Sequence, residues 1–169
     1  MQAADSPVPR NDPEPPRVDG VFQQLDAPQH ACAVALHALW QRLCPPDGIP
    51  CRTDFSFETV GDAGLLGHIF VIEPTGDGRD WRYRLLGSEI TWMFGRDVTG
   101  IPFREHFAPG EAEVCIALSN HVAETRIPVF LRGSIRSGSY SGVFETMSLP
   151  VWSRRRDAVW LIGGSFVER

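Results

Sequence analysis

Histidines and carboxylates are the side chains of this sequence that could support acid–base chemistry. His106 and His121 could each act as a general base beside a carboxylate, as a small hydrolase or isomerase of α+β fold would require. His30 and His37 lie seven residues apart, but no third ligand accompanies them, so a metal site is not indicated. The sequence has no G-x-S-x-G and no H-E-x-x-H motif. An enzyme of this sequence would therefore depend on a His–carboxylate pair assembled by the fold.

Cysteine and lysine usage narrows the chemistry further. No two of the four cysteines have the C-x-x-C spacing of a zinc knuckle or a thioredoxin-like motif. All 16 basic residues are arginine, which excludes mechanisms that need a catalytic lysine, such as the P-loop and Schiff-base chemistry. We expect the thiols to be reduced, in structural or incidental roles.

Glu145 is the carboxylate whose position is unusual. It alternates with Val143 and Met147 along a β-rich stretch, so the three side chains are expected on one face. A carboxylate that faces a core is costly unless it is paired. Glu145 is therefore expected either to pair with an arginine or to contact a ligand.

Composition favours one soluble domain of ordinary size. The chain has 169 residues, 43% hydrophobic and 22% charged, with a net charge of −5. The negative charge argues against nucleic acid or an anionic membrane as the main partner. No apolar run is long enough to span a bilayer, and residues 1–20 lack the apolar core of a signal peptide, so a cytoplasmic location is expected.

The N-terminal region divides into a tail and a helix. Residues 1–20 contain five prolines and few large apolar groups, which predicts a disordered tail before a single domain at 21–169. A helix is expected at about 26–44, with Asp26 as N-cap and Gln29 completing a capping box. Its apolar stripe, which includes Leu36 and Leu39, indicates either packing on the domain or a homodimer seam, and we expect a homodimer through this helix.

Five β-rich runs and the helices between them indicate an α+β fold. Strands are expected at 68–73, 81–86, 128–135, 142–152 and 158–167. A short helix at 89–94, ending at Gly95, and a longer helix at 111–125 separate the second strand from the third. This order predicts one antiparallel sheet with helices over one face.

Several short sequence motifs resemble those of an alphaproteobacterial subfamily of standalone PAS domain proteins. They are WRYRLLGSEI at 81–90 and FGRDVTG at 94–100, supported by Leu39-Trp40, by GIPCRTD at 48–54 and by ETMSLP at 145–150. The resemblance covers about residues 33–167. It implies a five-stranded antiparallel sheet of order 2-1-5-4-3, an extra N-terminal helix, and a cavity between the sheet and the helices. It also implies sensing or protein interaction without catalysis.

Strand and helix periodicity suggests which side chains would line that cavity. Tyr83 and Leu85 are expected to share a strand face, and the Tyr83 hydroxyl and Glu145 are its candidate polar groups. The complete set of expected ligand-binding residues is Tyr83, Leu85, Trp92, Phe103, Leu118, His121, Glu145 and Met147.

The cofactor and the partners follow from the same resemblance. Flavin-binding relatives carry a reactive cysteine in a helical sequence motif that is absent here, and the sequence around Cys115 is different from that motif. Haem-binding relatives carry a histidine on the helix before the third strand, where His121 is the candidate, but no propionate partners are evident and we expect no haem. The sequence therefore identifies no cofactor, and neither flavin nor haem is expected. An unidentified small molecule and a separate signalling protein are the expected partners.

Overall fold

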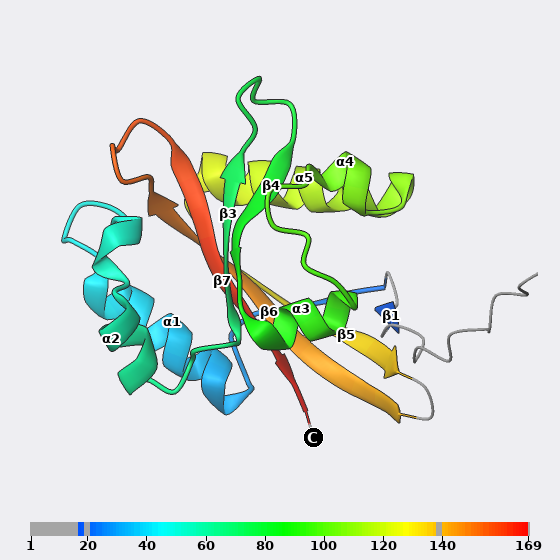
Figure 1. Ribbon diagram of the computed structural model, residues 1–169. Helices are drawn as coiled ribbons and strands as arrows, with labels where there is room; N and C mark the ends of the chain where they lie inside the picture. Colours follow the sequence, from blue (N-terminus) through cyan, green and yellow to red (C-terminus); the bar gives the residue numbers. More distant parts are fainter. Residues whose placement is uncertain (1–16, 19–20, 138–139, 169) are drawn as a thin grey trace, which may run out of the picture.

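The computed structural model describes residues 17–18, 21–137 and 140–168. Figure 1 shows a central antiparallel sheet with helices packed around it. The strands are β1 (Arg17–Val18), β2 (Gln23–Leu25), β3 (Ile69–Pro74), β4 (Trp81–Leu86), β5 (Val129–Ser137), β6 (Tyr140–Trp152) and β7 (Val159–Val167). The helices are α1 (Ala31–Leu43), the 3-10 turn η1 (Arg52–Asp54), α2 (Phe57–Asp62), α3 (Ser88–Phe94), α4 (Phe103–His106) and α5 (Pro109–Thr125).

The sheet contains seven strands in the described part of the chain. Their order is β1-β5-β6-β7-β3-β4, with β2 also paired to β5, and every pairing between named strands is antiparallel. The α+β class with an antiparallel sheet is thus confirmed, but the count of five strands is wrong. β1 lies inside the segment expected to be a disordered tail, and residues 1–16 and 19–20 of that segment lie outside the described residues.

Helices cover both faces of the sheet, which corrects the expectation of helices on one face. One core cluster joins α1 and α2 to side chains such as Ile69 and Val71 of β3. A second cluster joins α3, α4 and α5 to the alternate residues Phe70 and Ile72. Because successive side chains of a strand point to opposite faces, one strand serves both cores. In Figure 1, α1 and α2 lie together on one side of the sheet, away from α4 and α5.

The N-terminal helix packs on the domain. It begins at Ala31, with His30 as N-cap, so the expected start at Asp26 is wrong; residues 26–30 form an irregular connection after β2. The apolar stripe is buried against the sheet, where Leu36 and Leu39 are almost fully enclosed. The apolar stripe is therefore covered by the sheet of its own chain, so it gives no reason to expect a homodimer through this helix.

A bulge in the β3–β4 pairing reorients the end of β4. Val71 pairs with Leu85 whereas Ile72 pairs with Tyr83, so one extra residue is accommodated in β4. Tyr83 faces the core, but Leu85 is 38% exposed. The expectation that Tyr83 and Leu85 share a face is therefore wrong, because it assumed unbroken alternation.

Two glycines, Gly67 and Gly87, allow the start of α3 to pack closely against the chain just before β3. A Cβ on Gly87 would lie 2.2 Å from the carbonyl oxygen of Gly67, so only glycine allows the two backbones to approach this closely. The expected helix end at Gly95 is confirmed, since Gly95 adopts φ 70° at the C-cap.

Candidate ligand cavity

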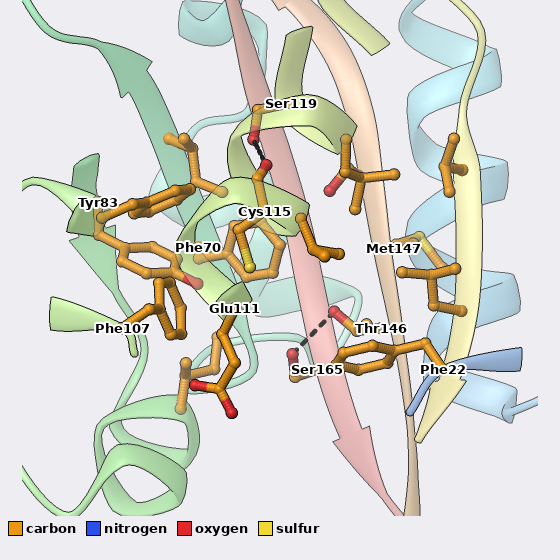
Figure 2. A pocket seen from close by; sticks show the side chains of 18 of the residues that line it. Phe22, Phe70, Tyr83, Phe107, Glu111, Cys115, Ser119, Thr146, Met147 and Ser165 are labelled. Atoms are coloured by element: carbon orange, nitrogen blue, oxygen red, sulfur yellow. Dashed lines mark hydrogen bonds between the residues drawn. The ribbon is translucent and has the colours of Figure 1, made fainter. Parts of the chain in front are cut away.

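A cavity of about 250 Å³ lies between the sheet and helices α3, α4 and α5. This volume is just below the range of roughly 300–1,000 Å³ typical of ligand pockets. The walls are largely apolar and aromatic, as Figure 2 shows. The lining residues that carry the following argument are Phe22, Tyr83, Glu111, Cys115, Thr146 and Ser165.

Tyr83 places a hydroxyl group in this apolar surface. Its ring is packed against Phe70, Phe94 and Phe103, with centroid distances of 5.7, 5.6 and 5.2 Å. The residue is only 8% exposed, and burial raises the pKa of the phenol far above its usual value, so the group is uncharged. In Figure 2 the hydroxyl points toward the interior of the cavity. It makes no hydrogen bond within the described part of the chain.

Two hydroxyl groups on neighbouring strands form a second polar spot. The Ser165 hydroxyl donates to Thr146 Oγ1 at 3.0 Å, and Thr146 donates in turn to the Gly164 carbonyl at 3.0 Å. Because the Ser165 proton is committed to Thr146, the lone pairs of Ser165 remain able to accept a hydrogen bond. The cavity thus presents a donor at Tyr83 and an acceptor at Ser165.

The deep groups of the cavity carry no charge at neutral pH. Burial raises the pKa of the Cys115 thiol to about 11, and the nearby Glu111 carboxylate adds to the effect. Cys115 is therefore a neutral thiol and a poor nucleophile. Glu111 also lines the cavity but is exposed, which places its negative charge on the solvent side.

His106 lies behind the aromatic wall. Its ring contacts Phe94 and Phe107, two cavity residues, at centroid distances of 4.7 and 4.3 Å. Both ring nitrogens are buried without a hydrogen-bond partner, and burial, aided by the charge of Arg96, lowers the pKa of His106 to about 4. Among the described residues, neither His106 nor the exposed His121 pairs with a carboxylate. The hydrolase or isomerase hypothesis thus lacks the pair on which it depended.

Four of the eight expected ligand-binding residues border the cavity. Tyr83, Phe103 and Leu118 belong to the core on that side of the sheet, whereas the Met147 side chain packs in the α1 core on the other face and only borders the cavity. The other four do not border it. Leu85 is turned outward by the bulge, and Trp92 is 42% exposed because Ile90 and Met93 occupy the inward positions of α3. His121 points to solvent from α5, on which Ser119 and Val122 are buried.

Glu145 lies on the opposite face of the sheet, where it binds the backbone just before α1. It is fully buried and accepts hydrogen bonds from the backbone N–H groups of Gln29 and His30, at 2.8 and 2.9 Å. Arg132 Nη2 lies 3.9 Å from Glu145 Oε2. Of the two roles expected for Glu145, a ligand contact is not supported, because the carboxylate serves the helix N-terminus and the arginine.

The alternation of β6 could have revealed the residues that the sequence analysis missed. Phe144, Thr146 and Ser148 all line the cavity, and they alternate with Glu145 and Met147. Small hydroxylated residues between large apolar ones leave space in a core, as do Ser165 and the neighbouring glycines in β7. Phe22 could not have been found in this way, because no local pattern shows that residues 23–25 join β5.

Neither a metal-binding cluster nor a membrane-spanning helix is present among the described residues. No group of three or more histidine, cysteine, aspartate or glutamate side chains among them is arranged to hold a metal ion. No helix in the same part of the chain combines the length and apolar character needed to cross a bilayer.

Comparison with known proteins identifies the family. A family model described as a PAS domain matches residues 28–165, from the N-terminus of α1 to near the end of β7. No curated protein and no solved structure matches the chain significantly. The match covers most of the chain and includes strands β3 to β6, most of β7 and helices α3, α4 and α5, which enclose the cavity together with Phe22. The chain therefore belongs to the PAS domain family.

Proposed function

We propose that this chain is a non-catalytic sensor module that binds a small uncharged molecule in the cavity and signals through a separate partner protein. Family membership supports a sensory or interaction role. The single observation that carries the ligand proposal is the Tyr83 hydroxyl, which faces the apolar cavity and has no hydrogen-bond partner in the described residues. A hydroxyl group that faces a cavity and has no partner in the protein is available to donate to a ligand acceptor.

The cavity chemistry supports a particular ligand class. Neutral Tyr83 and Cys115 offer no counter-charge to an anion, and Glu111 at the edge would repel one. The aromatic walls favour a flat ring. We expect a molecule of about one ring, with a carbonyl or similar acceptor for Tyr83 and, for the tightest binding, a donor for Ser165.

Three probes of similar size separate these features. Acetophenone has a ring and an acceptor, ethylbenzene lacks the acceptor, and benzoate carries a negative charge. Isothermal titration calorimetry with the whole chain should give the affinity order acetophenone, ethylbenzene, benzoate. Protein that has first been unfolded and refolded should be used, so that any copurified molecule is removed.

Tyr83→Phe tests the hydroxyl group. One hydrogen bond contributes about 0.5–1.5 kcal/mol, so acetophenone should bind about two- to tenfold more weakly while ethylbenzene is unaffected. Leu85→Ala, on the solvent side of the same strand, is the matched control and should change neither affinity. If none of the three probes binds, the ligand proposal fails and only the interaction role is left.

Homodimerisation and a cytoplasmic location remain predictions from the sequence. Dimerisation would need a surface other than the buried stripe of α1. Sedimentation of the whole chain at several concentrations would test it directly.

A further inference from the structure

Five arginines gather at one end of the sheet, where the turn between β6 and β7 lies. We call this surface the arginine end; it consists of Arg52, Arg126, Arg154, Arg155 and Arg156. The last three are consecutive and exposed in the turn, which is closed by a hydrogen bond from Ser153 N–H to the Ala158 carbonyl at 2.9 Å.

Contacts with the ends of β6 and β7 bring the other two arginines to the same place. Cys51 pairs with Trp152 in an isolated bridge, and its thiol lies 3.4 Å from the Ser153 carbonyl, which positions Arg52 beside the turn. Arg126, at the C-cap of α5, lies over the Trp152 ring. Figure 1 shows the C-terminal part of α5 approaching the end of the sheet where β6 and β7 are joined.

Two of these guanidinium groups are held by aromatic rings. Arg126 Cζ is 4.7 Å from the Trp152 ring centroid, and Arg52 Cζ is 5.6 Å from that of Trp160. Stacking on a ring fixes a guanidinium plane but leaves most of its N–H donors free for another acceptor. Arg52 Nε is buried and has no hydrogen-bond partner.

The positive charge of the arginine end is only partly offset within the described part of the chain. None of the five arginines forms an ion pair there, whereas Arg82, Arg104 and Arg132 do. Two carboxylates lie at the same end: Asp54 accepts from Cys51 N–H at 2.8 Å, and Asp157 accepts from the Ser153 hydroxyl at 2.6 Å and also interacts with the charge of Arg155. The five arginines outnumber these two acids. A positive surface is thus concentrated on a chain whose net charge is −5.

We propose that the arginine end docks an acidic segment of a partner protein, rich in aspartate and glutamate. Guanidinium groups bind carboxylates through paired hydrogen bonds, and the two ring-stacked arginines are already oriented for it. A short acidic segment needs to cover only this end of the sheet. A nucleic acid would extend its phosphates over the rest of a net negative surface, which would repel it.

Fluorescence anisotropy with a labelled octaglutamate peptide tests the proposal on the whole chain. The triple variant R154Q/R155Q/R156Q should bind the peptide at least tenfold more weakly than wild type. The control R79Q/R84Q/R96Q removes the same charge from three other exposed arginines and should change the affinity less than twofold. R126Q, which acts on the stacked half of the surface, should weaken binding about threefold.

Several outcomes would overturn the proposal. They are the absence of peptide binding by wild type, equal losses in the two triple variants, and tighter binding of single-stranded RNA or of phosphatidylserine vesicles than of the peptide. Circular dichroism verifies the fold of each variant. If the arginine-end triple variant is not folded, R126Q decides the question, and an unchanged affinity would count against the proposal. The result is independent of the cavity, since none of these substitutions touches it.

Discussion

Replacing Glu145 by alanine should destabilise the protein severely, although the residue is remote from the cavity. The carboxylate is fully buried and accepts two backbone N–H groups just before α1. Alanine would leave both N–H groups without a partner and would remove one of the two carboxylates near Arg132, which keeps Glu168 at 3.3 Å.

The size of the effect follows from these contacts. A hydrogen bond to a charged group contributes about 1.5–3 kcal/mol, and breaking a buried ionic arrangement costs about 3–5 kcal/mol. Because the two figures describe overlapping effects, we expect Glu145→Ala to lower the free energy of unfolding by about 3–5 kcal/mol. In a chain of this length, that lowers the melting temperature by about 6–20 °C. Glu145→Gln keeps one acceptor oxygen and should lose about 2 kcal/mol.

Urea unfolding followed by tryptophan fluorescence measures the change. Trp40 reports on α1 directly, because its indole N–H donates to the Pro150 carbonyl at 2.9 Å. Glu124→Ala, at an exposed position of α5, is the control and should change the stability by less than about 0.5 kcal/mol. A loss below about 1 kcal/mol in Glu145→Ala would refute the reasoning, since it would mean that the cost of burying the carboxylate cancels its hydrogen bonds.

Two further predictions concern His106 and Gly87. The pKa of His106 is about 4 in the folded chain, below its ordinary value of 6.5, so the unfolded chain binds the proton first and stability falls as the pH drops from about 6.5 to about 4. Urea unfolding at pH 7 and at pH 4.5 gives the free energy of unfolding that each protein loses between the two pH values. For His106→Phe this loss should be about 1–2 kcal/mol smaller than for wild type, a range that allows for solvent screening of a half-buried ring. Equal losses would contradict this. Gly87→Ala would place a methyl group 2.2 Å from the Gly67 carbonyl oxygen and should cost about 3 kcal/mol or more. Gly76→Ala, which meets nothing within 4 Å, should be nearly neutral in the same assay, and similar stabilities for the two variants would show that the chain relaxes around Gly87.

Local sequence determined most of the secondary structure of this protein. The strands from β3 to β7 follow β-favouring runs bounded by turn residues, and α3 ends at Gly95, whose φ of 70° suits glycine. These signals act over a few residues, so they can be read without knowing the rest of the fold. The sequence motifs within residues 81–100 also indicated the PAS domain family, which the family match over residues 28–165 confirms.

Tertiary structure alone decided which way the side chains face and what they meet. Alternation along the strand placed Glu145 and Met147 on one face, but it did not show which helix covers that face. In the structure, α1 covers it. Leu85 left the core because the pairing of β3 with β4 admits an extra residue, and β2 forms only because β5 offers an edge. The cavity likewise depends on several elements together. Tyr83 and Ser165 belong to different strands, and both line the cavity only once the sheet is assembled. Burial, register and empty space are set by contacts between distant segments, and no short stretch of sequence contains both partners of such a contact.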